Sequence, residues 1–172
     1  MPSYSSRSSD NQEISSGLGG QYLSFTLGDE DYGVDILKVK EIRGWEEVRP
    51  LPDTPDYVKG VLDLRGSIVP VIDMRLRFNQ EHAECTATTV TIILSIQLRG
   101  RPYMIGIVVD SVSDVLDIQA RDIKEGPSLG KKIDTRYILG MVSMDEHVVL
   151  LLDVDSLLDP DELVSRGDAT DG

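Results

Sequence analysis

Few side chains in this sequence are of the types that do chemistry. The two histidines are His82, in "NQEHAEC", and His147, in "MDEHV", and the single cysteine is Cys85. Zinc sites gather several Cys and His ligands at short, regular spacings, and this set does not supply them. We interpret Cys85 as a loop or strand-edge thiol rather than a nucleophile. The sequence therefore predicts no metal, no cofactor and no catalytic nucleophile.

One pair of carboxylates alternates along a predicted strand. Asp153 and Asp155 flank Val154, so both face the same side of the strand. Such a pair can act as general acid and base, but a solvated strand edge explains the same pattern. The sequence contains no nucleophile-elbow, phosphate-loop or dinucleotide-binding motif. A catalytic function therefore has little support.

Arg65 is the polar residue that most needs an explanation. It lies between two apolar runs in "GVLDLRGSIVPVIDM", in a chain with 17 basic and 30 acidic residues. Gly66 suits the left-handed backbone of a tight hairpin turn, whereas the turn does not require Arg beside it. We interpret Arg65 as a recognition residue. Pro70 lacks an N–H, so we expect an edge strand or a bulge there.

The overall charge narrows the class of partner. The net charge is −13, and an acidic surface repels nucleic-acid phosphates and anionic membranes. No apolar run reaches the roughly 20 residues of a membrane span, so no direct membrane insertion is expected. Residues 1–20 carry no apolar signal segment and are rich in Ser and Gly, so we expect a disordered tail there and another over 161–172.

The segment between the tails is predicted to be mostly strand. "QYLSFTL" alternates in polarity, and "GDED" is a turn before "YGVDILKVKEI". We expect this hairpin to pass into a helical turn around Val39 to Ile42. The prolines of "RPLPDTPDYV" predict an extended segment and then a short helix beginning near Thr54 and Pro55.

The chain repeats itself. "YVKGVLDLRGSIVPVIDMRLRF" begins at Tyr57, and "YILGMVSMDEHVVLLLDVDSLL" begins 80 residues later at Tyr137, with matching apolar positions. Upstream, "FTLGDEDYGVDI" resembles "IQLRGRPYMIGI". A repeat at a constant offset indicates a duplicated unit, and several short strands per copy fit small closed barrels. Two like barrels would leave a groove between them.

Apolar residues three apart occur in both copies. Val112 and Val115 lie in "GIVVDSVSDVLDI", and Val39 and Ile42 lie in the first copy. Ordinary core packing accounts for this spacing. The alternative is the apolar wall of a groove between the lobes that receives a helix, because amphipathic helices dock through spaced apolar anchors. The residues leave both possibilities open.

Four stretches together resemble the CheW family of chemotaxis coupling proteins. They are "FTLGDEDYGVDILKVKEIRG", "LPDTPDYVKGVLDLRGSIVPVIDMRLRF", "GIVVDSVSDVL" and "LLLDVDSLL", and the resemblance covers about residues 20–160. It implies an all-β fold with short helices, made of two intertwined five-stranded SH3-like barrels. The first barrel is expected over about 21–80 and the second over about 86–158, within a domain spanning 21–160.

The family resemblance also implies a function. CheW-like proteins are non-catalytic cytoplasmic adaptors, recruited to membrane-associated chemoreceptor arrays. They bind the regulatory domain of the histidine kinase CheA and the cytoplasmic tip of chemoreceptors. Carried over by position, the receptor-binding residues are Val39, Glu41, Ile42, Arg65, Val112 and Val115. The kinase-binding residues, carried over in the same way, are Gly60, Asp63, Ser67, Val69 and Val71.

Two alternatives remain. One is an adaptor of the same fold that serves another two-component pathway, such as pilus motility or gene regulation. The other is a small enzyme on a double barrel, which would need a buried polar constellation that the sequence does not indicate.

Overall fold

The computed structural model describes residues 19–78, 85–124, 137–145 and 147–157. The predicted tail over 161–172, His82 and nearly all of the predicted tail over 1–20 lie outside these residues. No helix in the described ranges is both long and apolar enough to cross a membrane.

Ten strands and a few short helices make up the described chain. The strands are β1 (Gly20–Leu27), β2 (Glu30–Asp35), β3 (Val39–Gly44), β4 (Val58–Leu64), β5 (Ser67–Asp73), β6 (Val90–Leu98), β7 (Arg101–Val109), β8 (Ser111–Ile118), β9 (Ile138–Met144) and β10 (His147–Leu152). The helices are η1 (Ile36–Lys38), α2 (Met74–Arg77), η2 (Ala120–Asp122) and η4 (Val154–Ser156). The predicted all-β class with short helices is confirmed.

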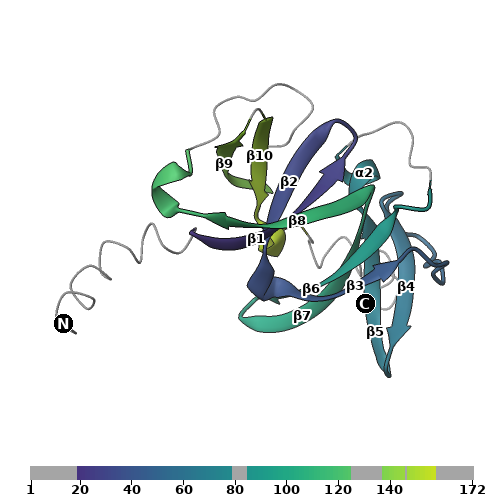
Figure 1. Cartoon of the computed structure of the whole chain (residues 1–172). Helices are drawn as coiled ribbons and strands as arrows, with labels where there is room; N and C mark the ends of the chain where they lie inside the picture. The colour runs from purple at the N-terminus through teal and green to yellow at the C-terminus, as the bar shows by residue number, and fades with distance from the viewer. Residues whose placement is uncertain (1–18, 79–84, 125–136, 146, 158–172) are drawn as a thin grey trace.

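The strands form two five-stranded sheets that exchange strands between the halves of the chain. Sheet A has the order β8-β1-β2-β10-β9, and sheet B has the order β3-β6-β7-β5-β4. In Figure 1 the purple and blue strands β1 and β2 accompany the green and yellow strands β8, β9 and β10. The expected ranges 21–80 and 86–158 therefore do not coincide with the two sheets, because the chain crosses after β2 and again after β7.

The internal repeat is visible in the strand order. Each strand has a counterpart five strands away in the chain, so that β1 corresponds to β6 and β8 to β3. When every strand of sheet A is replaced by its counterpart, the strand order of sheet B results. The Asp73 N–H donates to the Tyr57 carbonyl at 2.7 Å, and the Asp153 N–H donates to the Tyr137 carbonyl at the same distance. The residues "RGRP" of the second copy lie where β6 and β7 meet, and these nine-residue strands are longer than their counterparts β1 and β2.

Three local predictions are corrected. The helical turn is η1, just before the predicted site, because the Asp35 carboxylate caps the Leu37 N–H at 2.9 Å and β3 then pairs with β6. No helix begins at Thr54: the Val58 N–H bonds to the Pro55 carbonyl in a turn that returns the chain to β4. The predicted edge strand at Pro70 is wrong for β5 as a whole, because β5 lies between β7 and β4 in sheet B. Pairing with β7 begins only after Pro70, at Val71.

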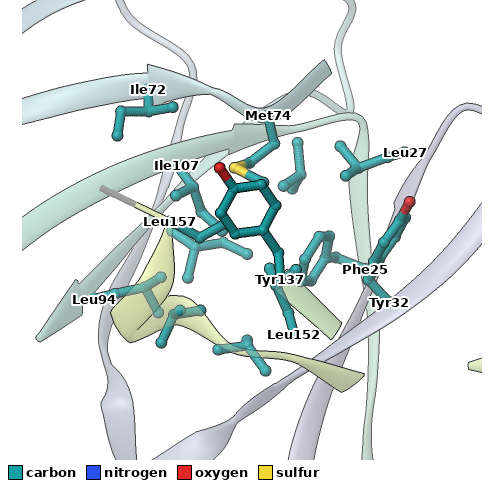
Figure 2. Packing of buried hydrophobic residues seen from close by; sticks show 14 of the residues in the cluster. Phe25, Leu27, Tyr32, Ile72, Met74, Leu94, Ile107, Tyr137, Leu152 and Leu157 are labelled. Atoms are coloured by element: carbon teal, nitrogen blue, oxygen red, sulfur yellow. The ribbon is translucent and has the colours of Figure 1, made fainter. Parts of the chain in front are cut away.

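The largest core cluster joins the two sheets. Phe25 and Tyr32 of sheet A pack into the same cluster as Ile72 and Ile107 of sheet B. Figure 2 shows Tyr137 at the centre of this cluster, between the two groups. Since one apolar core serves both sheets, we expect them to unfold together.

Tyr22 predicts an alkaline limit to stability. Burial in a second cluster with Ile118 and Leu151 raises the pKa of Tyr22 to about 12, with a further contribution from the Asp35 charge. The folded pKa lies above the ordinary value of 10.0, so this contribution is present below pH 10 and is lost as the pH rises toward 12. In urea unfolding from pH 9 to 12, Tyr22→Phe should lose less stability than the wild type. An identical pH dependence in both proteins would contradict this assignment.

Candidate binding surfaces

The β4–β5 hairpin presents Arg65 at its tip. Arg65 (φ 51°) and Gly66 (φ 89°) both have left-handed backbone, which is the conformation of a two-residue turn of type I′. The Asp63 carboxylate accepts the Gly66 N–H at 3.0 Å and closes the turn. The predicted hairpin turn and the role of Gly66 are confirmed, and Asp63 has a structural contact within the turn.

Arg65 and Glu41 lie in contact although 24 residues separate them. The Arg65 Nη2 donates to the Glu41 carboxylate at 2.7 Å, and the Arg43 Nη1 donates to the same carboxylate at 2.9 Å. Arg43 also binds Glu46 at 2.7 Å. The hydrogen bonds from Arg65 and then Arg43 hold the pKa of Glu41 below its usual range. The Arg65 side chain is 74% exposed, so it joins β3 to the hairpin tip while facing solvent.

The other predicted receptor residues divide between the core and the surface. Val39, from β3, and Val112, from β8, both pack against the core cluster that joins the sheets. Ile42 and Val115 are exposed instead, each on an edge strand of a different sheet. The structure thus brings Glu41 and Arg65 into contact and Val39 and Val112 to one core. In each pair of apolar residues three apart, one residue packs on the core and the other is exposed.

Three of the predicted kinase residues are buried. Val69 and Val71 have no exposed surface, because both faces of β5 are covered from Val69 onward. Gly60 is buried as well, and a Cβ there would lie 2.1 Å from the Arg49 carbonyl oxygen. These three positions therefore support the hairpin and do not form its surface. Asp63 and Ser67 are exposed at its tip.

Ile68, which the sequence did not single out, carries an exposed apolar surface on the same hairpin. Ile68 is 63% exposed and lines a shallow groove of about 480 Å³ with Val48, Val61 and Leu62, rimmed by charged Glu47, Arg49 and Asp63. We call the four apolar residues the hairpin patch. Strand alternation could have predicted the exposure of Ile68, because its neighbour Val69 points inward. Ile68 also precedes the part of β5 that pairs with β7.

A buried ion pair also escaped the sequence analysis. The Asp73 carboxylate accepts hydrogen bonds from the Arg75 Nε and Nη2, both at 2.9 Å, and both side chains are almost fully buried. Arg75 Nη1 also donates to Asp110 at 3.2 Å, and Asp110 accepts the Gly28 N–H at 2.7 Å. The hydrogen bonds that Arg75 donates to Asp73 raise the pKa of Arg75 further. This cluster holds α2 to the crossing after β7, and its charges compensate one another.

The carboxylates of Asp153 and Asp155 do not form the acid–base pair that the sequence left open. Asp155 accepts hydrogen bonds from Lys38 at 2.9 Å and from the Gln97 N–H at 2.9 Å, whereas Asp153 accepts one from the Ser156 hydroxyl. The two carboxylates thus serve separate local contacts and do not form a dyad. No group of three or more His, Cys, Asp or Glu in the described ranges could hold a metal ion.

Comparison with known proteins agrees with this architecture. A family model described as the CheW-like domain matches residues 21–162. The chemotaxis protein CheW of Klebsiella aerogenes is 43% identical over 146 residues, which is 85% of this chain and 86% of that protein. The chemotaxis protein CheW of Rhizobium meliloti is 33% identical over 84% of this chain and 90% of that protein.

A solved structure shows the same fold. The crystal structure of the scaffolding protein TtCheW from Thermoanaerobacter tengcongensis superposes with a TM-score of 0.74 at 29% identity, covering 83% of this chain and 89% of that one. The two sheets with exchanged strands, the internal repeat and the family match agree with one another. The chain described here therefore belongs to the CheW-like family.

Proposed function

We propose that the protein is a non-catalytic adaptor that couples chemoreceptors to a CheA-type histidine kinase. It would act in the cytoplasm, at membrane-associated receptor arrays. The observation that carries this proposal is the β4–β5 hairpin, which carries most of the hairpin patch and whose tip residue Arg65 binds Glu41 of β3. Relatives named as chemotaxis and scaffolding proteins support the same function.

The kinase regulatory domain is assigned to the hairpin patch. Exposed aliphatic residues beside a polar rim are typical of the centre of a protein–protein interface, and Ile68 is the most exposed member of the patch. Asp63 lies at the rim of this surface, and Ser67 is exposed at the hairpin tip. Gly60, Val69 and Val71 act only by holding the hairpin in shape, because they are buried.

The receptor tip is assigned to Arg65 and the exposed residues of the two edge strands. Arg residues are enriched among interface positions whose loss costs most affinity, and the contact with Glu41 holds the Arg65 guanidinium ready for a carboxylate or carbonyl of the receptor. Ile42 and Val115 supply exposed apolar contacts. Val39 and Val112 support this surface, because both pack on the core beneath it.

The variant Ile68→Glu should weaken binding of the isolated kinase regulatory domain by about 30-fold, equivalent to about 2 kcal/mol. The charge would have to be buried without a partner in the interface. Calorimetric titration measures the change. Val148→Glu is the matched control, because Val148 is the repeat counterpart of Ile68 on β10 and is partly exposed. Loss of binding in the control alone would place the kinase surface on the other hairpin.

The variant Arg65→Glu should weaken binding of a receptor-tip fragment by about 30-fold and leave kinase-domain affinity within about twofold of the wild-type value. The reason is that the new carboxylate faces Glu41 and repels acceptors on the receptor. Arg121→Glu, at an exposed position on η2, makes the same change in net charge. Normal binding of both partners by Arg65→Glu would remove the recognition role of Arg65.

A further inference from the structure

Arg77 lies between two tyrosines that correspond to each other in the internal repeat. Its guanidinium carbon is 4.5 Å from the centre of the Tyr57 ring and 4.9 Å from the centre of the Tyr137 ring. Its Nη2 also donates a hydrogen bond to the Tyr137 hydroxyl. A guanidinium over an aromatic face is attracted by the ring's negative potential, and more strongly where water is excluded. One cation therefore binds both copies of the repeat.

Each tyrosine also closes the open end of a hairpin. The Tyr57 carbonyl accepts the Asp73 N–H, which joins the start of β4 to the end of β5. The Tyr137 carbonyl accepts the Asp153 N–H, which does the same for β9 and β10. Because β4–β5 lies in sheet B and β9–β10 lies in sheet A, Arg77 connects the ends of two hairpins in different sheets.

Aromatic contacts extend from this point into sheet A. The ring centres of Tyr137 and Phe78 are 6.1 Å apart, and those of Phe78 and Tyr32 are 5.6 Å apart. Tyr32 stacks on Phe25 at 5.7 Å. Rings at these separations attract one another beyond simple burial. In a chain with only 5% aromatic residues, their concentration along one path favours a specific role for Arg77.

We propose that Arg77 is a positioning residue that couples the opening of the β4–β5 hairpin to that of the β9–β10 hairpin. When one hairpin end opens, its tyrosine ring separates from the Arg77 guanidinium. The guanidinium is then held by one ring alone, so its contact with the second tyrosine weakens. If β4–β5 carries the kinase surface, as proposed above, binding there also restrains β9–β10 in the other sheet. The coupling in the free protein does not depend on that assignment.

Native-state hydrogen exchange of the full chain tests the coupling. In Arg77→Leu we expect exchange at both the Asp73 and the Asp153 amides to accelerate by about tenfold, a loss of about 1.4 kcal/mol of protection. Arg77→Lys keeps a cation between the rings and should recover most of the protection. Acceleration at Asp73 alone, or at neither amide, would show that Arg77 only stabilises its own helix and would overturn the proposal.

Two further variants separate coupling from a general loss of stability. Tyr57→Leu removes one ring beside the guanidinium and should accelerate the distant Asp153 amide. Ile118 lies in the other core cluster. In Ile118→Ala, the exchange rates of the Asp73 and Asp153 amides should change only in proportion to the global free energy of unfolding. An unchanged Asp153 rate in Tyr57→Leu would contradict the coupling even if Arg77→Leu fails to fold.

Adding the kinase regulatory domain extends the same measurement. In the wild type, binding should slow exchange at Asp153. This slowing should persist in Arg77→Lys, which keeps a cation between the rings, and should be absent in Arg77→Leu. Slowing of equal size in the wild type and in Arg77→Leu would contradict the transmission through Arg77. A domain that does not bind at all would remove the proposed function and leave the result for the free protein standing.

Discussion

Replacing Asp73 with alanine is expected to lower the free energy of unfolding by about 3–5 kcal/mol, because it removes one partner of a buried ion pair and leaves the other charge uncompensated. Arg75 has only 1% of its side chain exposed, and its guanidinium donates two hydrogen bonds to the Asp73 carboxylate. Asp110 remains as a partner at 3.2 Å and compensates the charge only in part. Urea unfolding measures the loss.

The internal repeat provides the control for this variant. Asp153 is the counterpart of Asp73, but it is only half-buried and its carboxylate accepts a hydrogen bond from the Ser156 hydroxyl. Asp153→Ala should therefore cost only about 1 kcal/mol. The double variant Asp73→Leu/Arg75→Leu should recover much of the stability, because an apolar pair carries no desolvation cost. Equal losses for Asp73→Ala and Asp153→Ala would show that the buried pair has no special weight.

Replacing Gly60 with alanine is expected to cost about 3 kcal/mol, from backbone strain and steric overlap together. The backbone at Gly60 has φ +147°, and the new Cβ would lie 2.1 Å from the Arg49 carbonyl oxygen and 2.6 Å from the Arg49 carbonyl carbon. Both neighbours are backbone atoms of a segment that bridges to Val61 in β4. The strand and this segment would have to separate, and thermal or urea unfolding measures the cost.

Two other glycines separate the contributions at Gly60. Gly66 has φ +89° and nothing within 4 Å of a built Cβ, so Gly66→Ala should cost about 1–2 kcal/mol from left-handed strain alone. Gly44 has open space and no positive φ, so Gly44→Ala should be nearly neutral. If Gly60→Ala kept wild-type stability and still bound the kinase domain weakly, Gly60 would be a contact residue after all.

The local elements and the family could be predicted from the order of the residues alone. Strand alternation, the turn at Gly66 and the repeat between Tyr57 and Tyr137 are properties of neighbouring residues or of a constant offset, so they could be predicted before the fold was known. The four quoted stretches also carried the resemblance to the CheW family. The Arg65 tip was correctly placed for the same reason, since a two-residue turn leaves its side chain exposed.

Long-range packing determines which sheet each strand joins and which face of a strand is covered. The chain crosses after β2 and after β7, so strands from opposite halves pair, and no local pattern records that exchange. Covering both faces of β5 buries Val69 and Val71 and leaves Ile68 exposed. The contacts of Arg65 with Glu41, and of Arg77 with Tyr137, join residues far apart in the chain. Such contacts depend on packing between distant segments, because alternation specifies two faces of a strand but not what lies against each.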